Sequence, residues 1–553
     1  MNLLERFSTV IFLLHFMLLS SCMRIEEGRT SRLAITDVNG KEIQDLFLIP
    51  GMTYRLYAMS MVPTRDGEEI KGAATQDRFM DNILFSLDDL VSPVGIDQEG
   101  CLQVDPLAAS QTAIVRLNGD SIHRGKFDAL SRIHIESIPA IQVSTLIGGT
   151  ILDFQVAELR SRLAPTLFGI MAETNQAKNN IIFKIVDEKN ETPHPELGLL
   201  PNDKGLGVFS WSDTFRGNFN LGFGVFDATQ KAFSLKESLF SMLLSGLNKN
   251  PISIITTSTD MIKLVKLYGG AIGGGDSAVL GLYSSDKSEE YKLFLLSSAQ
   301  GASSGTIQDI TQSSGTDQSL ILHMNTSETP EDIIRFRESP LGGLTLLVRH
   351  LDKGLHKLKM ITLNHVQGVT VEDISNIESD AAHTFDIDVT KGGPKIIFVK
   401  NGNLLFAKRQ FDTWKIDTVP LGDADASMAP QLLGDTEDGT LAAMWGLKGE
   451  GLMRISKDQG ATWSNKAIHF SLASSKEPLL HLISFPCGGT GVLTVQNEKD
   501  IMFRLMHTGS DNFFEQKILS NPNPISHLHV FKDNTSIYVF YSDNRGIHFF
   551  SIN

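Results

Sequence analysis

The stretch from Leu441 to Trp463, LAAMWGLKGEGLMRISKDQGATW, contains the pattern that decides the fold. An apolar run at Leu441 to Trp445 is followed by a polar turn, a second apolar run at Leu452 to Ile455, another turn and a final tryptophan. Short apolar runs bounded by Gly, Asn, Asp and Ser are typical of β-strands joined by tight turns. The stretch therefore predicts two neighbouring strands of an antiparallel sheet.

The same arrangement recurs through the C-terminal part of the chain. A repeat of roughly 40–50 residues with about four strands is typical of the blades of a β-propeller. This period predicts about seven blades in residues 180–553, with six or eight possible. Because the last repeat is short, we expect an N-terminal strand to complete it and close the ring. The first strands of the clear copies begin at Ile396, Leu441, Val492 and Ile537, and weaker copies begin near Ala278 and Leu344.

The composition is that of a globular chain, with 41% hydrophobic and 20% charged residues. Lys and Arg number 49 against 64 Asp and Glu, which gives a net charge of −15. Nucleic-acid binders normally carry a basic excess that neutralises phosphates, so no nucleic-acid partner is expected. An anionic membrane surface would also repel this chain, so attachment to a membrane requires something other than charge.

Residues 33–145 predict a separate small domain ahead of the propeller. Strand-like runs at Thr53 to Tyr57 and at Ala113 to Leu117 are separated by turn signals such as Pro50-Gly51. We expect a β-sandwich of immunoglobulin-like type here, so that the whole chain has an all-β fold.

Two segments depart from the strand pattern. Residues 146–179 leave two possibilities open, a linker helix from Phe154 to Leu163 or the strand that closes the propeller. A second segment has apolar residues at helical spacing and a glycine that would stop a helix, and it predicts one helix beside the β framework. Its residues are Leu235, Leu239, Phe240, Leu243, Leu244 and Gly246.

The first residues predict export and lipid attachment. Phe7 to Leu19 is a mostly apolar run that is too short to span a bilayer but suits the core of a signal peptide. The string Leu19-Ser20-Ser21-Cys22 resembles the lipobox of bacterial lipoproteins, in which the cysteine is acylated and becomes the mature N-terminus. We therefore expect residues 1–21 to be a signal peptide, Cys22 to carry the lipid and residues 22–32 to be a tether. The residue after the cysteine, Met23, favours the outer membrane.

The two other cysteines, Cys101 and Cys487, lie far apart in the sequence. They can form a disulfide only if their regions touch in the fold. We expect two buried free thiols, because buried cysteine behaves as a small apolar residue.

A motif inside the opening stretch supports the propeller independently. The segment SKDQGATW resembles the Asp-box, S-x-D-x-G-x-T-W, of sialidases and other BNR-repeat propellers, and it fills every signature position. An aspartate in such a turn accepts backbone N–H groups, glycine allows a positive φ, and the tryptophan packs under the blade. The resemblance implies a structural role at the blade periphery for Ser456, Asp458, Gly460, Thr462 and Trp463.

The resemblance to sialidases does not extend to their catalytic residues. Sialidases bind the sugar carboxylate with three arginines and use a Tyr–Glu nucleophile pair with an aspartate acid/base. The Arg-Ile-Pro motif of the family is absent, and Arg335, Arg337 and Arg545 stand in no family context. Tyr541 is the best remaining nucleophile candidate. We therefore assign no catalytic residue.

Other catalytic or ligand-binding patterns have simpler explanations. Gly301 to Gly305 matches G-x-S-x-G but lacks the following helix that a nucleophile elbow requires. Gly269 to Gly275 is glycine-rich but is not followed by the Lys-Ser/Thr of a phosphate loop. His527 and His529 face one side of a strand, but no third metal ligand accompanies them. We expect no metal site at these histidines, nor at the group His383, Asp386 and Asp388. We expect neither a metal nor a cofactor.

Two classes of function remain open. We prefer a lipid-anchored module of the bacterial cell envelope, located at the outer membrane, that binds a glycan or a protein through its blade loops. The alternative is an exo-acting glycoside hydrolase of sialidase type. Fold alone does not decide between them, because one fold hosts many unrelated activities.

Overall fold

The computed structural model describes residues 32–552 with gaps, of which the longest are 310–321 and 188–196, followed by 160–166, 299–305 and 472–478. Over much of residues 188–263 it describes strands without their side chains. Within these ranges no helix is long and apolar enough to cross a membrane. Residues 1–31, with the expected signal peptide, Cys22 and most of the tether, lie outside the described residues.

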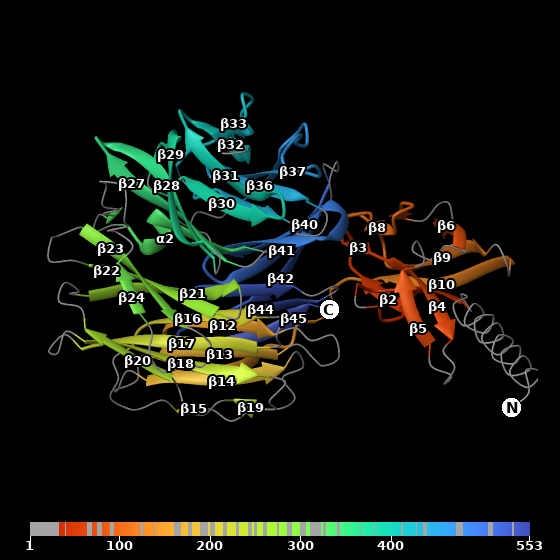
Figure 1. Ribbon diagram of the computed structural model, residues 1–553. Coiled ribbons are helices and arrows are strands. Elements are labelled where there is room, and N and C mark those ends of the chain that lie inside the picture. Colours follow the sequence, from red (N-terminus) through yellow and green to blue (C-terminus); the bar gives the residue numbers. More distant parts are fainter. Residues whose placement is uncertain are drawn as a thin grey trace, which may run out of the picture.

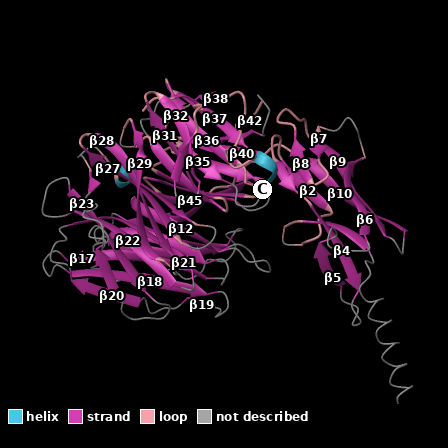
Figure 2. Cartoon of the chain, turned by 45° about the horizontal axis from the view of Figure 1, so that its top comes forward, coloured by secondary structure: helices cyan, strands magenta, loops and turns pink. Residues whose placement is uncertain are grey.

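The predicted all-β fold is confirmed. Helix in the described chain is confined to the single turn α2 (Pro330–Ile333) and the 3₁₀ turn η3 (Pro486–Gly488), which are the cyan segments of Figure 2. All other regular elements are strands, and nearly all of them pair in antiparallel sheets.

The N-terminal domain contains three small sheets with the orders β1-β4-β5, β2-β10-β9-β6 and β3-β8-β7. Only the β2–β10 pair in this domain is parallel among the described strands. The strands are β1 (Arg32–Thr36), β2 (Asp45–Leu48), β3 (Thr53–Arg55), β4 (Tyr57–Pro63), β5 (Glu69–Ala73), β6 (Met80–Leu87), β7 (Val94–Ile96), β8 (Cys101–Val104), β9 (Gln111–Ser121) and β10 (Gly125–Ile135).

The rest of the described chain forms eight sheets of four or five strands that follow one another around a ring. The first four sheets lie between residues 151 and 379. Their strands are β12 (Ile151–Leu159), β13 (Leu167–Thr174), β14 (Asn180–Asp187) and β15 (Leu197–Gly198); β16 (Gly205–Asp213), β17 (Asn218–Asp227), β18 (Ala232–Ser241), β19 (Gly246–Leu247) and β20 (Ile252–Thr257); β21 (Lys263–Gly273), β22 (Asp276–Ser284), β23 (Glu290–Ser298), β24 (Thr306–Asp309) and β25 (Leu322–His323); and β26 (Ile334–Glu338), β27 (Leu344–Asp352), β28 (Leu355–Asn364) and β29 (Gly368–Ser379).

The last four sheets complete the ring. Their strands are β30 (Phe385–Thr390), β31 (Gly393–Lys400), β32 (Asn403–Gln410), β33 (Thr413–Ile416) and β34 (Gly422–Asp423); β35 (Gln431–Gly434), β36 (Leu441–Leu447), β37 (Glu450–Ser456) and β38 (Ile468–Ser471); β39 (Leu480–Phe485), β40 (Gly489–Gln496), β41 (Asp500–Met506) and β42 (Phe514–Ser520); and β43 (His527–Lys532), β44 (Ile537–Asp543), β45 (Gly546–Ile552) and β11 (Ser144–Gly148).

The sheets form a β-propeller that is closed by strands from the two ends of the chain. The first strand of each sheet contacts the first strand of the next, in the order β12, β16, β21, β26, β30, β35, β39 and β43, and β43 contacts β12 again. In the last sheet β11 pairs antiparallel with β45, so an N-terminal segment supplies the missing outer strand. We call β11, β45, β44 and β43 the closing sheet.

Where the structure describes them, both segments with a predicted helix are strands; Leu243 and Leu244 lie outside the described residues. Leu235 lies in β18, which pairs with β17 on one side and with β19 and β20 on the other. Pairing with neighbouring strands on both edges stabilises the strand conformation here, although the local spacing of apolar residues also suits a helix. Phe154 to Leu159 lie in β12, so the described part of the second segment is strand and not helix, while residues 160–163 lie outside the described residues. The strand that closes the ring is β11. The ring therefore includes residues from Ser144 onward and not only those from residue 180.

The N-terminal domain packs against the last two sheets of the ring. Figure 1 shows it, in red and orange, beyond one end of the strands and next to the blue C-terminal sheets. One continuous apolar core includes Leu102 and Val115 of the domain together with Phe485, Leu505 and Val539 of the ring.

A disulfide between Cys101 and Cys487 crosses this junction, with a Cα–Cα distance of 5.6 Å. The expectation of two free thiols was therefore wrong. The two regions touch because β3 and β8 pack on η3, and Thr53 Oγ1 donates a hydrogen bond to the carbonyl of Pro486 at 2.5 Å. The disulfide closes a loop of 386 residues, a separation over which the sequence gives no signal of contact.

Candidate functional site on the inner strands

The ring has two faces that the direction of the strands distinguishes. In the closing sheet the turn at Asp543 joins the second strand to the third, whereas the turn at Asp458 joins the third strand of its sheet to the fourth. Because neighbouring strands are antiparallel, these turns lie at opposite ends of the strands. We call the two ends the Asp543 face and the Asp458 face. Cys487 lies between a first and a second strand, so the N-terminal domain adjoins the Asp458 face.

Arg335 and Arg337, on the inner strand β26, both bind Asp386 on the next inner strand, β30. Arg337 Nη2 donates to both carboxylate oxygens at 2.9 and 3.0 Å, and Arg335 Nε lies 3.8 Å from Oδ1. Arg335 also donates to the carbonyls of Phe385 and His383. The Asp386 side chain is 2% exposed. Its carboxylate also accepts a hydrogen bond from the backbone N–H of Leu432, which lies on β35, the inner strand of the following sheet.

Two histidines make equivalent contacts farther around the ring. The Nε2–H of His481 donates to the carbonyl of Leu528 at 3.1 Å, and that of His529 donates to the carbonyl of Phe154 at 3.1 Å. Burial and the neighbouring His481 lower the pKa of His529 to about 3, and burial also lowers the pKa of His481. Both rings are therefore neutral near pH 7, and each fastens one inner strand to the next.

These contacts determine what the inner strands can do chemically. Recognition of a carboxylate by arginine depends on a free fork of N–H donors. Arg335 and Arg337 direct N–H donors to Asp386 and to main-chain carbonyls. The inner strands thus use their arginines to hold neighbouring sheets together.

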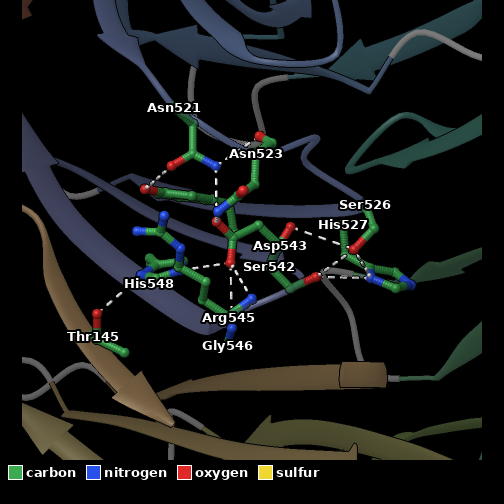
Figure 3. Close-up of polar contacts among 11 residues, drawn as sticks. Thr145, Asn521, Asn523, Ser526, His527, Ser542, Asp543, Arg545, Gly546 and His548 are labelled. Atoms are coloured by element: carbon green, nitrogen blue, oxygen red, sulfur yellow. Dashed lines mark hydrogen bonds and ion pairs between the residues drawn. The ribbon is translucent and has the colours of Figure 1, made fainter. Parts of the chain in front are cut away.

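Figure 3 shows a second polar cluster, around Asp543 in the closing sheet. The carboxylate is 3% exposed and accepts five hydrogen bonds of 2.7–3.2 Å. Burial would raise its pKa, but these bonds outweigh burial and hold the pKa far below its usual range. The donors are the side chains of Asn521, Asn523 and His548 and the backbone N–H groups of Arg545 and Gly546.

The cluster connects directly to the strand that closes the ring. His548 binds Asp543 through Nε2 at 2.9 Å, and its Nδ1 lies 3.1 Å from the hydroxyl of Thr145 in β11. Asn521 and Asn523 come from the link between the preceding sheet and the closing sheet. Asp543 therefore joins three segments of the chain at the Asp543 face.

Tyr541 belongs to the same cluster and is unsuited to act as a nucleophile. Its side chain is 1% exposed, stacks on the His548 ring at 4.9 Å, and has its hydroxyl 3.5 Å from Asn521 Oδ1. Burial and the nearby Asp543 charge raise its pKa to about 12. A tyrosine nucleophile needs access to substrate and an adjacent base, whereas this phenol is packed as a core residue.

The segment Ser456–Trp463 forms a tight turn at the Asp458 face. Asp458 accepts hydrogen bonds from the backbone N–H of Thr462 at 2.8 Å, the Thr462 hydroxyl at 2.6 Å and the Ser456 hydroxyl at 2.8 Å. Gly460 has a φ of +83°, and a side chain there would collide with the ring of Phe406 in the preceding sheet. The Trp463 ring packs edge-on against the same phenylalanine at 5.3 Å.

The remaining candidate motifs are dispersed or undescribed. His527 bonds to the Ser526 and Ser542 hydroxyls, while His383 binds the carbonyl of Ala426 through Nε2. Gly301 to Gly305 and Cys22 lie outside the described residues. In the part of the chain that the structure describes, no three His, Cys, Asp or Glu side chains gather as a metal site would require.

The partners of Asp543 could not be predicted from the sequence, because they are far apart in the chain. Its side-chain partners are Asn521, Asn523 and His548, and His548 in turn binds Thr145; no local spacing links these positions. The one available signal was the polar turn Asp543-Asn544-Arg545-Gly546, which has a common turn composition.

Comparison with known proteins gives similarity of fold and nothing closer. No protein-family model matches the sequence, and no curated protein matches it. Solved structures with a similar fold include a polysaccharide lyase, Uly1 (TM-score 0.35, 12% identity, covering 63% of this chain and 90% of that one), and the NanB sialidase from Streptococcus pneumoniae (0.30, 10%, 95% and 92%). A eukaryotic initiation factor is similar to the same degree (0.35, 9%, 90% and 97%). Likeness at this level carries no argument about function.

Proposed function

We propose that this chain is a lipid-anchored protein of the bacterial cell envelope, at the outer membrane, whose propeller binds a glycan or a protein as a recognition or scaffolding module. The observation that carries the proposal is the pairing of Arg335 and Arg337 with Asp386. The groups that would bind the carboxylate of a sialoside hold the sheets together instead. Tyr541, the nucleophile candidate, is buried and has a raised pKa.

The disulfide supports export of the chain. Disulfides persist in oxidising compartments such as the bacterial periplasm and are rare in the cytosol. The Cys101–Cys487 bond agrees with the signal peptide expected at residues 1–21. Acylation of Cys22 would then provide the membrane attachment that a net charge of −15 does not favour.

Binding is tested on a glycan array and on immobilised envelope proteins with purified protein. We expect retention of a glycan or protein ligand without release of a cleaved product. Absence of binding to both glycans and proteins would contradict the proposal. Release of sugar would support the alternative function, a glycoside hydrolase.

The anchor is tested with Cys22→Ala. Without the thiol no acyl chain can be attached, so we expect the variant to leave the membrane fraction while the wild type remains there. Ser20→Ala, which retains the cysteine, is the matched control. Equal membrane retention of Cys22→Ala and the wild type would contradict lipid anchoring.

One observation favours the alternative, an exo-acting glycoside hydrolase of sialidase type. Asp153 on the inner strand β12 lies directly opposite Glu173 on β13. Burial and the Asp153 charge raise the pKa of Glu173 to about 7, a range that suits a general acid. Glycoside cleavage that Glu173→Gln abolishes and Glu158→Gln, on the same strand as Asp153, retains would support this alternative.

A further inference from the structure

We propose that the N-terminal domain is a rigid pedestal that turns the Asp543 face of the ring away from the membrane, toward partners in the surrounding medium. The proposal rests on the lipid anchor of the proposed function. It adds which surface of the ring is presented, and it places the partner in solution or on a facing surface and not in the supporting bilayer.

The domain is fixed to the ring by covalent and noncovalent contacts. The disulfide between Cys101 and Cys487 joins the two parts, and Thr53 bonds to the carbonyl beside Cys487. The apolar core continues across the junction, where Phe47, Ile49 and Met52 of the domain meet Phe485, Leu505, Ile537 and Ile552 of the ring. Domains that share a large apolar interface and a covalent link move as one body.

The described residues of the domain adjoin one face of the ring, the Asp458 face. Its contacts with the ring gather around η3 and the two last sheets, at the Asp458 face. Figures 1 and 2 show the domain beyond one end of the strands in two views. The Asp543 face lies at the opposite ends of those strands.

The segment between the expected anchor and the domain is short. Only ten residue steps separate Cys22 from Arg32, the first residue of β1. A fully extended chain of that length spans about 35 Å at most. The domain therefore stays near the membrane.

The direction of β1 places the ring on the far side of the domain. Thr36, at the other end of β1 from Arg32, pairs with Tyr57. Tyr57 lies two residues after Arg55, which pairs with Cys101 at the junction. Arg32 thus lies at the end of β1 away from the ring.

The test measures how far the two faces lie from a lipid surface. The lipidated full-length protein is placed in vesicles whose headgroups carry an energy-transfer acceptor, with a donor dye on one introduced cysteine. The two positions are Glu450→Cys and Lys457→Cys, which are both exposed and lie at opposite ends of β37. A strand of this length separates them by about 20 Å. Cys101 and Cys487 do not react with the dye, because they form the disulfide.

We expect more energy transfer from Lys457→Cys, at the Asp458 face, than from Glu450→Cys. Equal transfer, or more from Glu450→Cys, with the protein bound to the vesicles, would overturn the pedestal while leaving the anchor intact. Cys22→Ala added to each variant separates the two proposals, since loss of vesicle binding supports the anchor. Vesicle binding that survives Cys22→Ala would overturn the anchor and the pedestal that rests on it.

Discussion

Asp458 and Asp543 are two aspartates at opposite faces of one ring, and both accept several hydrogen bonds. The Asp458 partners, Ser456 and Thr462, lie within four residues of it, and the carboxylate is exposed. The Asp543 partners come from the link before the closing sheet and from the start of β45, and one of them, His548, binds Thr145 of β11. Asp543 is 3% exposed. The same chemistry shapes a local turn in the first case and joins distant parts of the ring in the second.

The largest effect is expected at Asp543. Asp543→Ala removes the acceptor of the buried Asn521 and His548 and of the half-buried Asn523, and such losses cost about 3–5 kcal/mol. Asp543→Asn retains one carbonyl acceptor and should lose less. Denaturant unfolding of both variants measures the difference. A cost at Asp543→Ala no larger than that at Asp458→Ala would remove the distinction between the two sites.

Removal of the disulfide has the next largest expected effect. The double variant Cys101→Ser with Cys487→Ser leaves no free thiol at the junction and should lose about 2–4 kcal/mol, because the unfolded chain is no longer cross-linked. Since the disulfide lies at the face opposite Asp543, the added cost of Asp543→Ala should be the same with and without it. Strong coupling between the two changes would show that the closing sheet depends on the N-terminal domain.

A smaller effect is expected at Asp458. Asp458→Ala should cost about 1–2 kcal/mol, because the freed N–H of Thr462 is exposed and water replaces part of the lost hydrogen bonding. Ligand binding should survive, which an array measurement at a temperature below the melting transition checks. Lost binding with an unchanged melting temperature would give this turn a functional role.

The pH dependence of the free energy of unfolding tests the contribution of the Asp543 charge. Hydrogen bonds outweigh burial at Asp543 and hold its pKa low, so the folded state keeps the ionised form. This stabilisation is complete above the unfolded pKa of about 3.9 and decreases as the pH falls below it. The stability difference between the wild type and Asp543→Asn should therefore shrink between about pH 4 and pH 2. A difference that stays constant over this range would show that the charge of Asp543 contributes nothing.

The two aspartates also show how far the sequence can predict this molecule. The Asp458 turn could be predicted because all its residues are contiguous in the sequence. The strand repeats could be predicted because each contains its own alternation of apolar runs and turns. The Asp543 cluster could not be predicted from the sequence, because Thr145 and His548 come into contact only when β11 pairs with β45.

Other differences have related causes. The pairing of Cys101 with Cys487 depends on the docking of a whole domain. The apolar spacing around Leu235 suits a helix and a strand alike, and neighbouring strands decide the outcome. The pairing of Arg337 with Asp386 follows from the stacking of inner strands, which a pattern within one strand does not encode.

The most direct test of the central claim is hydrolysis of a fluorogenic sialoside and a panel of other glycosides by the wild-type protein. The claim is that Arg335 and Arg337 join neighbouring sheets and that Tyr541 is buried in the closing sheet, so that none of the three is available for hydrolysis. It predicts no cleavage by the wild type, alongside measurable binding of a glycan or protein. Cleavage by the wild type that Tyr541→Phe abolishes, with the fold and melting temperature retained, would contradict it.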